Sequence, residues 1–197
     1  RLQPPFLLAA SWLFYAAAMP AMLPLLLALC AFTYGCGRGL SGAHKTAFLR
    51  LGVIGSLAVL AFFKYVNFLA GLFPWGLRLP ALALPLGISF YTFAAISYLV
   101  DAARGDCPVE RSFVRYALFL SLFATVTQGP ICRAGRLLPQ LDAEHRFDAA
   151  RCVRALRLFA LGLFKPVAVS DVLGVLVDNV FAHYREYGGL MLLAGGV

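Results

Sequence analysis

The apolar run at residues 47–69 contains only two charged residues, Arg50 and Lys64. At 1.5 Å per residue, a helix of this length crosses the roughly 30 Å hydrocarbon core of a bilayer. Comparable runs recur along the 197 residues, of which 61% are hydrophobic and 13% charged. A soluble domain is closer to half apolar and a quarter charged. The sequence therefore predicts an all-α, polytopic integral membrane protein.

Basic residues give the chain a net charge of +8, and they cluster between the apolar runs. In membrane proteins, an excess of lysine and arginine marks the loops on the cytoplasmic side. The charge therefore indicates orientation, and no soluble stretch mixes basic with aromatic residues as nucleic-acid binding would require. The five cysteines form no CxxC pair and the three histidines lie far apart, so we expect neither a disulfide framework nor a metal site.

The apolar sequence before the first basic loop is interrupted by Pro20 and Pro24. Because proline disrupts a helix interior, we predict two short helices, at about 5–19 and 21–36, with a kink or turn between them. The loop that follows, at residues 38–50, is rich in glycine and basic residues, which indicates the cytoplasmic side.

Residues 82–100 form the next predicted span, after a short external turn at 73–80. Three hydroxyl-bearing residues of this span, Ser89, Thr92 and Ser97, fall within one broad sector of a helix. Hydroxyl groups placed in this way either bond to neighbouring helices or line a tunnel. The spacing leaves both alternatives open.

The next apolar run, Phe113–Thr127, is predicted to be helical and is followed by Gln128, Gly129 and Pro130. Proline lacks an N–H group and disfavours helical geometry in the residue before it, so the helix is predicted to break at Gly129 and Pro130. Backbone groups freed inside a bilayer need partners in the protein or in a water-filled cavity. The break is therefore a candidate site, with a simple helix end at the membrane surface as the alternative.

The position of the following arginines bears on how this run meets the membrane. If residues 113–130 crossed it fully, residues 131–157 would carry six arginines on the outside, against the positive-inside rule. If the run enters and returns, these arginines lie on the cytoplasmic side together with residues 38–50. About sixteen apolar residues also span only roughly 24 Å as a helix, less than the hydrocarbon core. We therefore predict a re-entrant element.

The break supplies two candidate side chains. The amide of Gln128 both donates and accepts hydrogen bonds, which suits freed backbone groups or a substrate carbonyl. The planar guanidinium of Arg133 suits the bidentate binding of phosphate groups, although it is also explained as one more cytoplasmic charge. The predicted substrate-site or tunnel-lining residues are Gln128, Gly129, Pro130, Arg133, Ser89 and Thr92.

Further along the chain, Lys165 and Pro166 interrupt an apolar segment, and a kink is predicted there. Asp171 and Asp178 lie seven residues apart and share one face of a predicted amphipathic helix. That face is predicted either to be solvated or to point into a cavity.

Several stretches of the chain are informative when they are read together and in order. They are residues 63–67, 84–105, 128–133, 138–141, 162–166 with Ser170 and Asp171, and 187–189. This ordered set resembles one family, the bacterial membrane-bound O-acyltransferases. The resemblance is greatest to the alginate O-acetyltransferase-like proteins and weaker to the teichoic-acid D-alanyl transferases. It covers nearly the whole chain, and it is the ordered set, rather than any single motif, that is specific.

The resemblance implies an hourglass-shaped helical fold in the bacterial cytoplasmic membrane, with a thin central floor between two funnels. A tunnel through that floor lets an acyl donor meet an acceptor from the opposite side. In the alginate-like proteins, the donor is thought to be cytoplasmic acetyl-CoA. The acetyl group passes outward to polysaccharide, often with extracytoplasmic partner proteins. We expect no tightly bound cofactor.

The catalytic histidine of this family lies in an apolar segment of the C-terminal half, and none of His44, His145 and His183 has that context. We assign the catalytic role to no residue of this chain. Residues 1–197 are predicted to be a single membrane domain that forms the N-terminal portion of a longer protein, or a truncated protein without the chemistry. Pro166 also replaces what is commonly a second lysine in the family.

Two functions therefore compete. The first is part of an acetyl transferase acting on a cell-surface polysaccharide, with the expectation that this chain alone transfers no acyl groups. The alternative is a non-enzymatic channel, transporter or scaffold subunit, since kinked and re-entrant helices also build transporter sites. Transporters usually place ionisable residues at mid-membrane, whereas most charges here lie near segment ends and no repeat is visible.

Overall fold

The computed structural model describes residues 3–72, 83–127, 129–143, 147–183 and 189. Across these residues the secondary structure is helical and contains no strand, so the predicted all-α class is confirmed. The chain divides into two compact units, Arg1–Ala143 and Glu144–Val197. The expectation of one membrane domain over residues 1–197 stays a prediction.

Three helices in the described part of the chain are long and apolar enough to cross a membrane. They are Pro20–Gly39, Lys45–Val66 and Ala149–Ala182. The chain is thus a polytopic membrane protein, as its composition predicts.

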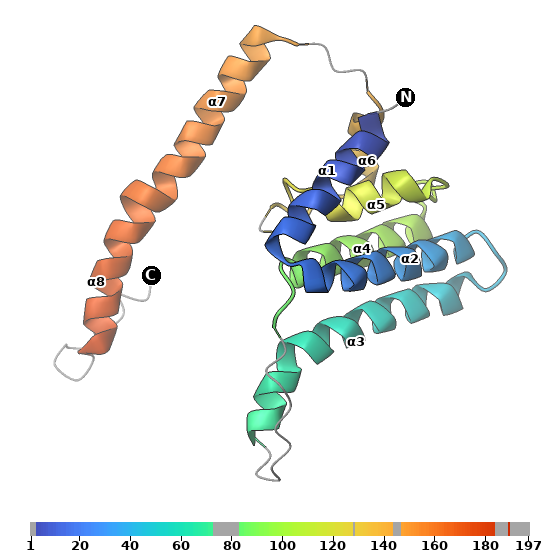
Figure 1. The fold of residues 1–197 in the computed structure, drawn as a ribbon, viewed down its shortest axis with the longest axis horizontal. Coiled ribbons are helices and arrows are strands. Elements are labelled where there is room, and N and C mark those ends of the chain that lie inside the picture. Colours follow the sequence, from blue (N-terminus) through green and yellow to red (C-terminus); the bar gives the residue numbers. More distant parts are fainter. Residues whose placement is uncertain (1–2, 73–82, 128, 144–146, 184–188, 190–197) are drawn as a thin grey trace. The chain divides into compact units, whose positions relative to one another are not determined.

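The first unit contains six α-helices in its described residues. Helix α2 packs against α3, α4 and α5, while α1 packs mainly on α5, so α2 occupies the middle of the bundle (Figure 1). The helices are α1 (Gln3–Ala18), α2 (Leu23–Gly39), α3 (Lys45–Leu72), α4 (Ile88–Arg104), α5 (Phe113–Ser121) and α6 (Ala134–Asp142).

The two short helices predicted around the first prolines are confirmed as α1 and α2. Pro20 opens a single 3₁₀ turn, Pro20–Met22, and Pro24 lies in the first turn of α2. Proline is tolerated at these positions because the N–H groups of a first turn have no partner within the helix. The two prolines therefore begin new helical segments.

Helix α4 begins at Ile88, six residues later than predicted, because Pro85 and Gly87 precede it and Gly87 adopts a left-handed conformation (φ 70°). At 17 residues, α4 is about 25 Å long and shorter than the hydrocarbon core. The predicted helix at 82–100 is therefore wrong for the described residues 83–87, while residues 88–100 are helical as predicted. The turn predicted at 73–80 lies outside the described residues.

The core of the first unit is built on packed tyrosines. The rings of Tyr98 and Tyr116 lie 4.8 Å apart, and both side chains are fully buried. The Tyr116 hydroxyl donates to Thr33 Oγ1 at 2.8 Å, and Thr33 donates to the Leu29 carbonyl at 2.6 Å. This chain of hydrogen bonds ties α5 to α2 and satisfies the buried hydroxyl groups.

The second unit contains α7 (Ala149–Phe164), a π-helical turn (Lys165–Ser170) and α8 (Asp171–Ala182), drawn as one continuous rod in Figure 1. The predicted distortion at Pro166 is present, and it takes the form of the π-turn. The side chains of α7 are exposed on all sides of the helix. In α8, Asp178 is exposed as expected for a solvated face, whereas the Asp171 side chain is outside the described set.

Candidate functional site

The re-entrant run begins with a helix that is shorter than the sequence suggests. Helix α5 has nine residues and ends at Ser121, so the prediction of a helix through Thr127 is wrong. Leu122 leaves helical geometry (ψ 121°), and its carbonyl accepts the N–H groups of Thr125 and Val126, both at 2.9 Å. Residues 123–127 thus form a closed turn, which we call the floor turn.

The reason for this early end lies in α1. Ser11 Oγ accepts the N–H of Phe123 at 3.2 Å and donates to the Leu7 carbonyl at 2.8 Å. The indole N–H of Trp12 donates to Ser121 Oγ at 3.1 Å. Side chains of α1 therefore hold the last residue of α5 and supply a partner for the N–H of Phe123, two residues further along.

Two glycines enclose the floor turn. A Cβ added to Gly87 would lie 1.7 Å from the Val126 carbonyl oxygen, and one added to Gly129 would lie 2.4 Å from Thr125 Cα. The Gly129 N–H also donates to the Thr125 carbonyl at 3.2 Å. The candidate residue Gly129 is therefore placed by close backbone packing, while its neighbour Gln128 lies outside the described residues.

Two ion pairs connect the ends of this segment to one short stretch of chain. Arg115, in the first turn of α5, lies 3.4 Å from Glu110, and Arg133, just after the break, lies 3.5 Å from Asp101. The start and the end of the segment therefore contact the same region, the C-terminal end of α4 and the loop that follows it. A nine-residue helix is also only about 14 Å long. Both observations favour the re-entrant prediction, which only a topology experiment tests directly.

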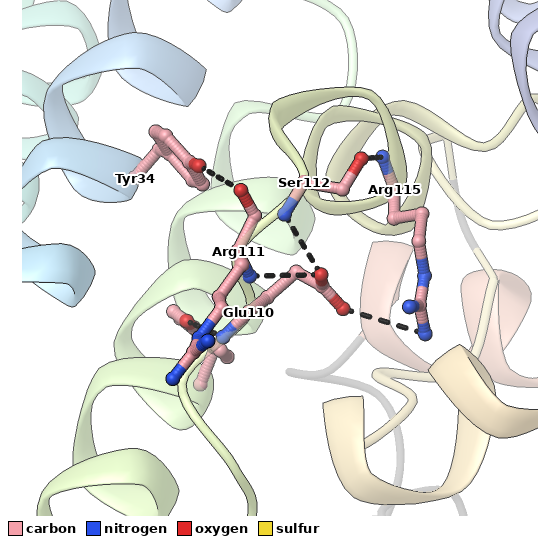
Figure 2. A network of polar contacts seen from close by, with 6 residues as sticks. Tyr34, Glu110, Arg111, Ser112 and Arg115 are labelled. Carbon is pink, nitrogen blue, oxygen red and sulfur yellow. Dashed lines mark hydrogen bonds and ion pairs between the residues drawn. The ribbon is translucent and has the colours of Figure 1, made fainter.

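Figure 2 shows the hydrogen bonds that fix the entrance. Glu110 Oε1 accepts the backbone N–H groups of Arg111 and Ser112, both at 2.9 Å. The Tyr98 hydroxyl accepts the N–H of Glu110 at 3.0 Å, and the Tyr34 hydroxyl donates to the Arg111 carbonyl at 2.6 Å. Residues from α2 and α4 thus hold the start of α5 in place (Figure 2).

A cavity of about 790 Å³, here called the mouth cavity, opens where α4 ends and α6 begins. Arg133 lies in it, with its side chain 67% exposed, beside the nearly buried carboxylate of Asp101. Arg136 comes from the first turn of α6, and no side chain caps that helix. Free N–H groups at a helix start and arginine side chains both favour anions. The lining residues are Asp101, Asp106, Cys107, Ile131, Cys132, Arg133, Gly135, Arg136, Leu137 and Gln140.

A narrow space of about 20 Å³, the neck, lies beside the mouth cavity, with which it shares the lining residues Ile131, Cys132 and Leu137. It has room for about one water molecule. The break itself forms part of its wall through Gly129 and Pro130.

A third space, the far cavity of about 450 Å³, lies at the other end of α4 and shares Phe90 with the neck. Its remaining lining comes from residues 84–89 and Thr127. From Phe90 to Asp101 is about 16 Å along the helix. The mouth cavity, neck and far cavity therefore follow α4 from one end to the other, with the narrowest point beside the break.

Curated relatives align with most of this chain. It is 36% identical over 192 residues to the probable alginate O-acetylase of Pseudomonas aeruginosa. The alignment covers 89% of this chain and 36% of the relative. The corresponding protein of Azotobacter vinelandii is also 36% identical, with 38% of its length covered. The peptidoglycan O-acetyltransferase of Helicobacter pylori is 30% identical over 217 residues, covering 93% of this chain and 40% of the relative. The chain belongs to the membrane-bound O-acyltransferase family.

The resemblance to this O-acyltransferase family inferred from the motifs is thus confirmed, although the chain spans only about two fifths or less of the length of these relatives. No family model and no solved structure matches the chain.

The structure brings together some of the site residues predicted from the sequence and separates others. Arg133 lines the mouth cavity, Gly129 and Pro130 line the neck, and Ser89 lines the far cavity. Thr92 is fully buried, and its Oγ1 has no hydrogen-bond partner among the described residues. It lines none of the three spaces, so Thr92 is not placed with the others.

Sequence reasoning missed the acidic side of the mouth cavity, where Asp101, Asp106 and Cys107 lie. A carboxylate at the end of a long apolar run, as at Asp101, was the available signal. Burial raises the pKa of the Cys107 thiol, and the neighbouring Asp101 and Asp106 carboxylates raise it further. Cys107 is therefore protonated near neutral pH and is a poor nucleophile.

The histidines gain no catalytic role from the structure. His44 and His183 are exposed, and His145 lies outside the described residues. A search of the described residues finds no group of three or more His, Cys, Asp and Glu side chains that could hold a metal ion.

Proposed function

We propose that this chain forms the donor-side part of an O-acetyltransferase in the bacterial cytoplasmic membrane. The enzyme would transfer acetyl groups from cytoplasmic acetyl-CoA to hydroxyl groups of an exported polysaccharide. The observation that carries the proposal is the series of spaces along α4, from the mouth cavity through the neck to the far cavity. The names of the relatives, which are O-acetylating enzymes for alginate and peptidoglycan, support the same chemistry.

The mouth cavity is the proposed place for the phosphates of the donor. Asp101 contacts Arg133 through Nη1 alone, at 3.5 Å, and the guanidinium carries five N–H donors. The mostly exposed Arg133 side chain therefore retains donors for a phosphate, which its planar fork binds bidentately. Arg136 and the uncapped start of α6 add positive potential at the same place.

The neck is the proposed passage between donor and acceptor. In the transfer, an acceptor hydroxyl oxygen attacks the thioester carbonyl, a new ester bond forms, and the carbon–sulfur bond breaks to release the CoA thiolate. We assign the base that takes the hydroxyl proton to no residue of this chain. The residues described here bind the donor, orient it and narrow its path beside Gly129 and Pro130.

The test uses the longest natural protein that contains this chain, in inside-out vesicles given acetyl-labelled CoA and the exported polysaccharide. Arg133→Gln is expected to raise the KM for acetyl-CoA by about tenfold for each 1.4 kcal/mol of lost binding, with a smaller effect on kcat. Arg104→Gln is the matched control, because Arg104 is exposed at the end of α4 and does not line the mouth cavity. Gln128→Ala tests the remaining candidate of the break in the same assay.

Three outcomes would contradict the proposal. No label in the polysaccharide, with the protein folded and the donor intact, would remove the transferase assignment. Passage of the donor across the vesicle without transfer would point instead to a transporter. Equal KM values for the Arg133 and Arg104 variants would remove the donor phosphates from the mouth cavity. Extracytoplasmic partner proteins belong to the same proposal and are tested by whether acetylation requires their addition.

A further inference from the structure

The first half of α7 carries three arginines, Arg151, Arg154 and Arg157, at a spacing of three residues. At 100° per residue they fall within a 120° arc of the helix, so they form one stripe, here called the arginine stripe. All three side chains are exposed. Among the described residues, no carboxylate pairs with any of them. Three adjacent guanidinium groups without counter-ions on one helix face are a site for an external anion.

The length of the helix indicates where the arginine stripe lies in the membrane. Ala149–Ala182 comprises 34 residues and is about 51 Å long, far more than the roughly 30 Å hydrocarbon core. The twenty residues after Arg157, from 158 to 177, fill that thickness and contain only two charges, Lys165 and Asp171. Asp178 then falls at the opposite boundary. Residues 149–157 are left for the headgroup layer.

We propose that the arginine stripe binds the phosphate group of an anionic bilayer lipid. With Arg157 at the hydrocarbon boundary, Arg154 lies about 4.5 Å and Arg151 about 9 Å further out. The headgroup layer on each side of a bilayer is roughly 5–8 Å thick, so the three side chains cover it. Their forked N–H groups match phosphate oxygens bidentately. The inference depends on α7 alone and is independent of acetyl transfer.

The surroundings of the arginine stripe select a lipid rather than a soluble polyphosphate. Leu158 and Leu161, which continue the same face of the helix beyond Arg157, are 71% and 60% exposed. A lipid covers these apolar side chains with its acyl chains while its phosphate meets the arginines. A nucleotide or free phosphate satisfies the charges but makes no contact with these side chains, which lie within the hydrocarbon layer.

The test is native mass spectrometry of the complete 197-residue chain, titrated in detergent with phosphatidylglycerol and with phosphatidylcholine. Each basic residue near an anionic surface contributes roughly fivefold in affinity. Replacing all three arginines of the stripe by glutamine is therefore expected to weaken phosphatidylglycerol binding about 100-fold and to leave phosphatidylcholine binding unchanged. The matched control neutralises three other exposed basic residues, Arg38, Lys45 and Arg50, with the same change in net charge.

Each further result has a defined meaning. The proposal would be overturned if the variant with three glutamines at the stripe and the control variant lost equal affinity for phosphatidylglycerol, since only overall charge would then matter. Displacement of phosphatidylglycerol by equimolar inorganic pyrophosphate would also overturn it, in favour of a soluble phosphate ligand. A variant with lysine at all three positions keeps the charge but loses the forked donors. Its affinity is expected to fall between those of the arginine and glutamine forms, which separates loss of charge from misfolding. Helix content by circular dichroism should be equal in all variants.

Discussion

Alanine at Gly87 should be unusually costly, because this glycine has two separate constraints. Its φ of 70° lies in the left-handed region, where a residue with a Cβ loses about 1–2 kcal/mol. The new Cβ would also lie 1.7 Å from the Val126 carbonyl oxygen, whereas real Cβ contacts stay beyond 3.0 Å. The floor turn must therefore move by more than 1 Å, and overpacking of this kind costs about 1–3 kcal/mol more.

Gly105→Ala provides the matched control. Gly105 has a similar positive φ of 89°, but a Cβ there meets nothing within 4 Å. It carries the conformational cost without the clash. Comparing the two substitutions therefore isolates the contact between Gly87 and the floor turn.

The assay is thermal unfolding of both variants in the same detergent, monitored by loss of the monodisperse peak. For a chain of this size, 1 kcal/mol lowers Tm by roughly 2–4 °C. We expect Gly87→Ala to melt about 2–12 °C below Gly105→Ala, because the clash alone costs about 1–3 kcal/mol. Since Val126 also lines the neck, Gly87→Ala should reduce acetyl transfer in the longer protein more than its loss of stability explains. Equal melting temperatures for the two variants would refute the close packing of α4 on the floor turn.

Three other predictions follow from the site. Single cysteines at Ser41 and Ala143, in a cysteine-free background, should react with an impermeant reagent from the same side, and labelling from opposite sides would mean that residues 113–130 span the membrane. Glu110→Ala should cost about 2–3 kcal/mol and Glu110→Gln only about 1 kcal/mol, because glutamine still accepts the backbone N–H groups seen in Figure 2; equal losses would assign the whole effect to the ion pair. Because burial and two carboxylates raise the pKa of the Cys107 thiol, its alkylation in a single-cysteine variant should be slow at pH 7 and should accelerate with rising pH up to that pKa, and a rate independent of pH would exclude this environment.

Patterns of apolarity and proline predicted most of the helices. The pair of prolines, Pro20 and Pro24, located the junction between α1 and α2, because proline acts on the local backbone. Pro85 and Gly87 also indicated that α4 begins late. The apolar residues around them, however, looked like a continuation of the helix. In both cases the local sequence was sufficient to locate the helix boundary. For α4, the prediction gave Pro85 and Gly87 too little weight.

The end of α5 could not be predicted from local sequence. Residues 123–127 are as compatible with a helix as those before them, and the helix stops because Ser11 supplies a partner to the N–H of Phe123. That partner is 112 residues away along the chain. The same holds for the ion pair between Asp101 and Arg133, which made one predicted site residue part of a cavity that the sequence did not reveal. Tertiary contacts, rather than propensities, decided both features.

The two ion pairs at Glu110 and Asp101 have a consequence for biogenesis. If the segment between them is re-entrant, neither Arg115 nor Arg133 has to be translocated, and moving an arginine through the bilayer centre costs about 2.5–3.5 kcal/mol even on insertion scales. The segment can then enter from the side on which it is synthesised, after α4 is already in place. Its assembly becomes the closing of a loop onto an inserted helix, a step that requires no help from the machinery that threads chains across membranes.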